Sequence, residues 1–211
     1  MNVIESGCLR VRPVLVRPSC YEEGREQDCL RCGYGSDGKC LSTMRLCTAQ
    51  YPGHRKGCPN YGRKDDCPPN MPMLDEVFDL TKPVYCIYTK FDMEEHTRRM
   101  RLKHPHWSDR QCRCCLYWQN DVRKKQKAHA FAVYQTIKTD GLFLTDTPEA
   151  MGVDVTKTLQ AEGVFLEWPC VHHVYKISFA GVVRESIVEG KRIRGRQVAF
   201  LENGFLVIKK P

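Results

Sequence analysis

The cysteines constrain this chain more than any other feature of its sequence. Among 211 residues there are 13 cysteines, and eight of them fall within the first 67 residues. These eight are Cys8, Cys20, Cys29, Cys32, Cys40, Cys47, Cys58 and Cys67. A chain of this length can bury an apolar core without covalent cross-links. We therefore expect the cysteines to bind metal or to do chemistry rather than to compensate for a small core.

The sequence carries no signal for export or for a membrane span. No apolar stretch with a basic start and a small-residue cleavage site opens it, and no run approaches the roughly 18 apolar residues of a spanning helix. We therefore expect a cytoplasmic protein. In a reducing compartment, many cysteines indicate metal binding or catalysis before disulfides. Twelve paired cysteines and one free thiol remain the alternative reading of the odd count.

Composition divides the chain at about residue 70. Residues 1–70 are rich in Gly, Pro and Arg and poor in periodic apolar pattern, which indicates loops around a ligand. Residues 11–16 are the exception and predict a short strand, placed at a sheet edge by Pro13. Residues 71–211 show the pattern of an α+β core. We expect one α+β domain with a mixed or antiparallel sheet, a few helices and a cysteine-rich, loop-dominated N-terminal segment.

Apolar periodicity predicts the elements of the core. Helices are expected at 73–80, 93–104 and 119–138, and strands at 83–89, 171–183, 185–190 and 195–211, the last with a turn at Asn203-Gly204. In helix 119–138 we expect Ala128, Phe131, Ala132 and Ile137 to face the core. Another helix is expected to begin with Asp146 as N-cap, Pro148 in the first turn and Glu149 completing a capping box. Gly163 is expected to end it.

The motif with the clearest chemistry is residues 57–70, GCPNYGRKDDCPPN. Its two cysteines, Cys58 and Cys67, lie nine positions apart, and each is followed by proline. A turn at Tyr61-Gly62 can bring both thiolates to one point, and the prolines stiffen the chain beyond each ligand. Cys-Pro pairs are frequent in iron–sulfur ligation. Zinc sites more often pair cysteines two to four residues apart, a spacing found here in Cys29 and Cys32.

Two stretches resemble one family. Residues 45–72, RLC followed by GCPNYGRKDDCPPNMP, resemble predicted metal-binding proteins of unknown function that carry a cysteine, Cys-Pro-x-Tyr-Gly and then Cys-Pro-Pro. Residues 148–163, PEAMGVDVTKTLQAEG, are similar to the closing helix of that family. The resemblance implies metal or iron–sulfur binding by Cys47, Cys58 and Cys67. The family also carries a Cys-x-x-Cys-x-x-Cys group before this helix, and no cysteine stands there in this chain.

The number of cysteines is sufficient for two predicted metal sites. Cys20, Cys29, Cys32 and Cys40 are predicted to form a four-thiolate site for zinc or a cluster. Cys47, Cys58 and Cys67 are predicted to hold an iron–sulfur cluster, most simply of the [4Fe-4S] type, with Cys112, Cys114 or Cys115 as fourth ligand. A closed cluster suits electron transfer. A cluster with an open iron would suit an oxidoreductase or a sulfur-transfer or desulfuration enzyme.

Positive charge is the second functional signal. The formal net charge is +8, and much of the excess lies in three groups: Arg98, Arg99, Arg101 and Lys103; Arg123, Lys124, Lys125 and Lys127; Lys191, Arg192, Arg194 and Arg196. Trp107, Tyr117 and Trp118 lie between the first two groups and could stack on bases. The positive charge therefore predicts an anionic partner. This partner is either a nucleic acid, as tRNA or a single strand, or an acidic redox protein. The alternative function is a zinc-stabilised, basic nucleic-acid-binding module without catalysis.

Overall fold

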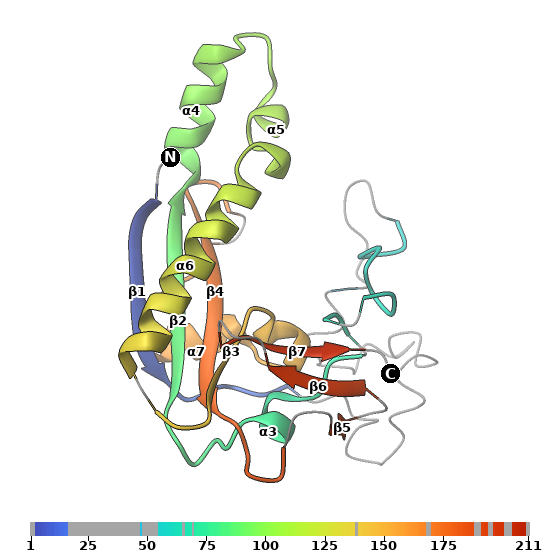
Figure 1. Ribbon diagram of the computed structural model, residues 1–211. Coiled ribbons are helices and arrows are strands. Elements are labelled where there is room, and N and C mark those ends of the chain that lie inside the picture. Colours follow the sequence, from blue (N-terminus) through green and yellow to red (C-terminus); the bar gives the residue numbers. More distant parts are fainter. Residues whose placement is uncertain are drawn as a thin grey trace.

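The fold is built on a four-stranded antiparallel sheet with the order β1-β2-β4-β3 (Figure 1). The computed structural model describes residues 3–16, 47, 55–64, 66–68, 70–137, 139–167, 170–187, 191–193, 196–200 and 204–209. The strands of the main sheet are β1 (Val3–Val11), β2 (Val84–Asp92), β3 (Leu142–Thr145) and β4 (His173–Val182). β2 and β4 pair over their full length, from Val84 opposite Gly181 to Asp92 opposite His173. The expected α+β class with an antiparallel sheet is confirmed.

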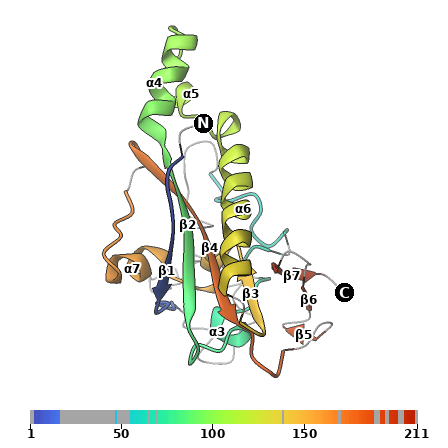
Figure 2. The same cartoon turned by 60° about the vertical axis from the view of Figure 1, so that its left-hand side comes forward.

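A second sheet and several helices complete the described part of the chain. The second sheet has the order β5-β6-β7 and consists of β5 (Arg192–Ile193), β6 (Arg196–Phe200) and β7 (Leu206–Lys209). The α-helices are α3 (Leu74–Val77), α4 (Met93–Lys103), α5 (Asp109–Cys112), α6 (Gln119–Ile137) and α7 (Val155–Ala161). Two 3₁₀ turns, η2 (Cys115–Tyr117) and η3 (Pro148–Met151), precede α6 and α7. Figure 2 shows α4 and α5 projecting beyond one end of the main sheet.

Apolar side chains cover both faces of the main sheet. Successive residues of a strand point to opposite faces, and in β4 Phe179 and Ala180 accordingly belong to different clusters. Phe179 packs with Leu159 of α7 and with residues of α3, whereas Ala180 packs with Ala130 of α6. Burying a side chain of this size is worth about 1.5–3 kcal/mol. The helices on the two faces therefore hold the sheet between them.

Several predicted elements are confirmed. Leu74, Val77 and Phe78 of the first predicted helix are all fully buried, and β2, α4 and α6 lie where periodicity places them. The predicted hairpin near the C-terminus is present as β6 and β7, although Phe200 pairs with Leu206 and leaves five residues between them. Gly163, with φ +78°, follows α7 as expected.

Three expectations are wrong. The N-terminal strand is Val3–Val11 and not 11–16, because Pro13 lacks the amide proton that would continue the pairing. Asp146 does not cap a helix: η3 follows Thr147, and α7 is capped by Asp154, which accepts a hydrogen bond from the amide of Lys157. Residues 185–187 form no strand, while 188–190 lie outside the described residues.

The face that α6 buries also differs from the prediction. Ala128 and Ala132 are exposed, and Phe131 is 38% exposed. The residues fully enclosed are Val122, Gln126 and Ala130, with Ile137 half-buried against the same cluster. Gln126 replaces an apolar residue there because its amide donates to the carbonyl of Ile87 at 2.8 Å and to the hydroxyl of Ser178 at 3.1 Å. A pattern that counts only apolar residues cannot predict the burial of a glutamine whose amide is hydrogen-bonded.

Candidate functional site

The candidate site begins with the cysteine loop, which we define as the described residues from Arg55 to Asn70. Turns build it: Gly57 and Gly62 have φ values of +79° and +68°, a backbone region that favours glycine. The amide of Gly62 donates to the carbonyl of Pro68 at 2.8 Å and closes the loop. The amide of Cys58 donates to the carbonyl of Cys47 at 2.5 Å. These contacts bring the three predicted ligands into one region.

The thiols of Cys47, Cys58 and Cys67 influence one another electrostatically. Burial raises the pKa of Cys47, and the nearby charges of Cys58 and Glu149 raise it further. Burial together with the charges of Asp66, Cys58 and Cys47 raises the pKa of Cys67 to about 11. The thiolates of Cys47 and Cys67 are therefore disfavoured by burial and by their neighbours. Within the described residues, however, no three His, Cys, Asp or Glu side chains meet at the spacing of metal ligands.

The other predicted ligands lie elsewhere. Cys20, Cys29, Cys32 and Cys40 are outside the described residues, so their four-thiolate site stays a prediction. Cys112 is fully buried at the end of α5, and Cys115 is exposed in η2. Neither is among the groups that shift the pKa of Cys47 or Cys67. The role of Cys112, Cys114 or Cys115 as a fourth ligand therefore also stays a prediction.

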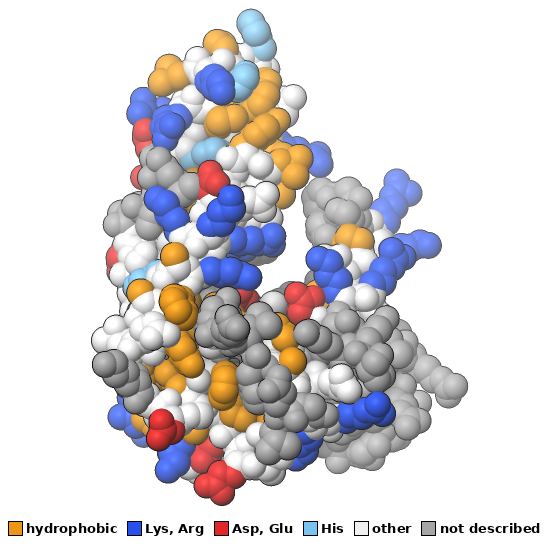
Figure 3. Space-filling view, viewed as in Figure 1, with side chains coloured by type: hydrophobic (Ala, Val, Ile, Leu, Met, Phe, Trp, Pro, Cys, Tyr) orange, Lys and Arg blue, Asp and Glu red, His pale blue; other side chains and the backbone are white. Residues whose placement is uncertain are grey.

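A hollow lies between α6 and the cysteine loop. β3 ends at Thr145, opposite Phe179, so that among the described residues the part of β4 from His173 to Ser178 has no strand paired to it on this edge. In Figure 3, Lys and Arg side chains line the α6 side of the hollow, and acidic side chains lie at its floor. In Figure 1, the cysteine loop (cyan) stands across from the start of α6.

A hydrogen-bond network joins α6 to β4 and to the residue that follows β3. The hydroxyl of Ser178 accepts from Gln126 and donates to Asp146 Oδ1 at 2.7 Å. Lys127 Nζ lies 3.3 Å from Asp146 Oδ2. Asp146 is thus engaged by a hydroxyl and an ammonium group, which explains why it does not cap a helix. No sequence pattern indicates this network, because its members come from α6, from β4 and from Asp146, the residue that follows β3.

Lys176 of β4 and Glu149 of η3 carry charges that act on each other. Burial and the charge of Arg123 lower the pKa of Lys176, while the charges of Glu149, Cys115 and Asp146 act in the opposite direction. Glu149 is exposed as a residue, yet protein surrounds it on most sides, and this burial raises its pKa. Glu149 also acts on Cys47. Glu149 therefore acts on both Cys47 and Lys176.

A carboxylate that the sequence reading missed organises the start of β4. The predicted strand 171–183 would turn the rings of His172 and His173 to opposite faces, but in the structure His172 precedes the strand and both rings lie near Glu167. Their Nδ1 atoms lie 2.7 and 3.6 Å from the Glu167 oxygens. Burial opposes the charged form of Glu167, but hydrogen bonds from the amides and the ring lower its pKa to about 2. Glu167 therefore holds together the residues that precede β4.

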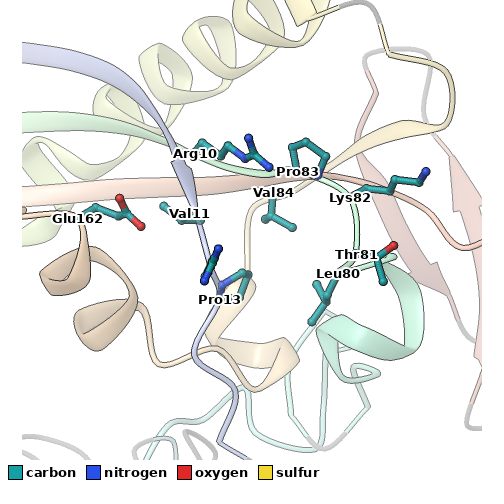
Figure 4. Close-up of a pocket in the computed structure, with 10 residues that line it drawn as sticks. Arg10, Val11, Pro13, Leu80, Thr81, Lys82, Pro83, Val84 and Glu162 are labelled. Atoms are coloured by element: carbon teal, nitrogen blue, oxygen red, sulfur yellow. The ribbon is translucent and has the colours of Figure 1, made fainter.

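A separate cavity of about 660 Å³ opens where β1 ends beside the loop that precedes β2 (Figure 4). Val11, Val84 and Leu80 form an apolar part of its wall, and the charged groups around it are Arg10, Arg12, Lys82 and Glu162. No cysteine lines it. The cavity does not contribute to the thiol site.

No helix among the described residues is long and apolar enough to cross a membrane. Comparison of the chain with models of protein families, with curated proteins and with solved structures gives no match. The site must therefore be interpreted from its own residues.

Proposed function

We propose that this protein binds an iron–sulfur cluster through Cys47, Cys58 and Cys67 and uses it to handle electrons or sulfur. The observation that carries the proposal is the proximity of three cysteines that lie up to 20 positions apart in sequence. The amide of Cys58 donates to the carbonyl of Cys47, the loop closes from Gly62 to Pro68 beside Cys67, and the charge of Cys58 raises the pKa of both Cys47 and Cys67. Such proximity places three ionisable thiols where their negative charges repel, an arrangement that a bound cation would stabilise.

The chemistry of the donors fits a thiolate-bound metal. Iron–sulfur clusters are held by cysteine thiolates, and binding of a metal deprotonates its thiol ligands. When bound, a cluster would supply one-electron transfer or, with an iron left open, a Lewis-acid position for sulfur chemistry. The residues of the chain would hold it through the cysteine loop, whose turns at Gly57 and Gly62 and whose backbone hydrogen bond from Cys58 to Cys47 support this proposal.

The proposed family resemblance gains one structural support. Its two stretches, residues 45–72 and 148–163, are far apart in sequence, yet the charge of Glu149 from the second acts on Cys47 from the first. The amide of Val16 also donates to the carbonyl of Gly152 at 2.8 Å, tying the N-terminal segment to the second stretch. We infer that the two motifs form one site.

The decisive measurement is iron, zinc and acid-labile sulfide content, with a visible spectrum, on protein purified without oxygen. We expect iron with matching sulfide and a broad visible absorption. Cys58→Ser and Cys67→Ser should lose most of the iron. Cys170→Ser is the matched control, because Cys170 is half-buried and contacts the carbonyl of Glu167 rather than another thiol. Unchanged iron in both loop variants would refute this choice of ligands.

A zinc-stabilised binding module is the second candidate function, and the surface of the α4–α5 projection favours it. Leu102, Leu116 and Tyr117 are 70%, 80% and 50% exposed beside the basic residues of α4. Trp118 cannot stack on a base, since it is buried against Phe91 with ring centroids 5.2 Å apart. Zinc without sulfide in the measurement above would favour this candidate.

The partner proposed for the basic surface is single-stranded nucleic acid or tRNA. Neutralising Arg123, Lys124 and Lys125 together should weaken binding of a single-stranded oligonucleotide and flatten its salt dependence, because each lost phosphate contact removes counterion release. All three side chains are exposed on α6. An unchanged slope would exclude α6 as the contact and would favour an acidic redox protein as the partner.

A further inference from the structure

The cavity at the end of β1 lies where two prolines stop the pairing of β1 with β2. The last pair of this ladder is Val11 opposite Val84. Pro83 directly precedes Val84, and Pro13 follows two residues after Val11. Proline has no amide proton to donate to a strand ladder. Beyond the last pair the two segments therefore cannot continue the sheet, and both of them line the cavity of about 660 Å³ (Figure 4).

Hydrogen bonds to different elements fix the two walls of this cavity. Beyond β1, the amide of Val14 donates to the hydroxyl of Thr158 in α7 at 2.9 Å. In the loop before β2, the amide of Asp79 donates to the carbonyl of Val182 in β4 at 2.8 Å. The Asp79 carboxylate accepts from the amide and the hydroxyl of Thr81 at 3.0 and 2.7 Å. The cavity is thus built into the fold, and its volume is in the usual range of about 300–1,000 Å³ for ligand pockets.

One part of the wall is apolar and belongs to the protein core. Val11 and Val84 are 4% and 2% exposed, and both are members of the core cluster that also contains Phe179. Leu80 is half-buried and packs against the same cluster. An apolar group placed against this wall would lose contact with water, which is favourable.

The charged part of the wall is mainly cationic. Its charged side chains are Arg10, Arg12, Lys82 and Glu162. Among the described residues, no carboxylate lies within ion-pair distance of any of these three cations. Figure 4 shows Lys82 and Glu162 at opposite ends of the cavity. Lys82 also acts on the charge of Asp79, outside the lining. The two arginines therefore give the cavity a positive potential, which a concave surface strengthens.

We propose that this cavity binds a small amphipathic anion. Its apolar body would lie against Val11, Val84 and Leu80, and its oxyanion head group, carboxylate or phosphate, would bind Arg10 and Arg12. Both arginines are exposed, so a head group can reach them. A guanidinium group can donate two parallel hydrogen bonds to an oxyanion. No cysteine lines the cavity, so this site goes beyond the proposed function and does not depend on it.

The test is a calorimetric titration of the full chain at low ionic strength with three probes that share one alkyl chain: octanoate, octyl phosphate and 1-octanol. Both anions should bind, and the tighter one identifies the head group. Octanol should bind at least about 10-fold more weakly, the size expected for loss of a hydrogen bond to a charged group. Butanoate should also bind at least about 10-fold more weakly than octanoate, because a shorter chain buries less apolar surface.

Variants locate the binding. Arg10→Gln combined with Arg12→Gln should weaken octanoate at least about 10-fold and leave octanol unchanged. Arg110→Gln is the matched control, since Arg110 is an exposed arginine of α5, which lies beyond the opposite end of the main sheet (Figure 1). Its affinity for octanoate should stay within about twofold of the original protein. Glu162→Gln should bind octanoate as tightly or more tightly, because it removes the carboxylate of the lining.

Three results would overturn the proposal: no binding of either anion to the original protein, octanol as tight as octanoate, or unchanged affinity for octanoate in the double arginine variant. If the double variant does not fold, Arg12→Gln against Arg110→Gln decides, because Arg12 lies outside β1. Iron content is measured on the same samples. Cys58→Ser should lose iron and keep octanoate, so failure of the cluster and failure of the cavity are distinguishable. Loss of octanoate binding in Cys58→Ser would place the anion at the cysteine loop and contradict the cavity.

Discussion

The main sheet and the cysteine loop are held together by different forces. In the sheet, side chains such as Phe78, Phe179 and Leu159 are completely buried. In the cysteine loop, most described side chains are exposed or half-buried, and turns and single backbone hydrogen bonds define the chain path. Apolar burial therefore stabilises the main sheet, whereas it contributes little to the stability of the cysteine loop.

This difference indicates where a ligand would contribute most. A region with few buried apolar contacts has low local stability, and metal binding adds free energy to the segment that carries the ligands. The sheet needs no such help. Each prediction below tests the contrast, from the largest expected effect to the smallest.

Phe179→Ala should have the largest effect on folding. Phe179 is fully buried between β4, α3 and α7, and removing such a ring costs about 3–5 kcal/mol of unfolding free energy. Urea denaturation followed by circular dichroism measures it. Phe165→Ala is the control, since Phe165 is 69% exposed and should change stability by less than about 0.5 kcal/mol. Equal losses in the two variants would contradict the assigned core.

Gln126→Leu should have an intermediate effect. The leucine would keep the volume but remove the donor to the Ile87 carbonyl and the Ser178 hydroxyl. Leaving buried polar partners without a hydrogen bond costs about 1–3 kcal/mol. The same denaturation experiment measures it, with Gln119→Leu at the start of α6 as a half-buried control. A gain in stability would show that the network is not needed for folding.

Glu167→Gln should have a smaller, pH-dependent effect. The folded-state pKa of Glu167 is lowered from 4.5 to about 2. Its carboxylate therefore contributes stability that is complete above about pH 4.5 and is lost as the pH falls toward 2. The original protein should be more stable than the variant at pH 7, and the two urea midpoints should approach one another at low pH. A gap that does not change with pH would refute the role of the charge.

Cys58→Ser in metal-free protein should have the smallest effect. The side chain is half-buried in a loop that the sheet does not need, so the unfolding free energy should change by less than about 0.5 kcal/mol. When both proteins are prepared with metal, Cys58→Ser should show faster amide hydrogen exchange in residues 55–70 than the original protein. Exchange in β2 and β4 should be the same in the two proteins. A large loss of unfolding free energy in the metal-free variant would contradict the conclusion that the sheet is stable without the cysteine loop.

The sequence predicted the elements well where the apolar pattern is regular. β2 and α4 follow directly from it, as does the burial of Leu74, Val77 and Phe78. The failures have physical causes. Asp146 has a side chain that often caps a helix, but it accepts a hydrogen bond from Ser178 and pairs with Lys127 instead. Gln126 is polar but buried. In both cases, a partner distant in sequence decides the role of the residue.

The candidate site shows the same division. The spacing and the Cys-Pro pairs single out Cys58 and Cys67, and Cys47 joins them through the motif that precedes them. The sequence alone also determined the class of donor, because only side-chain identity decides whether a site offers sulfur or oxygen. It could not show that Glu149 of η3 acts on the charge of Cys47, or Arg123 of α6 on that of Lys176 in β4, since these residues lie in different elements. Only the tertiary structure decided that neighbourhood, because the short β3 leaves the edge of β4 open and the charges there interact through space rather than along the chain.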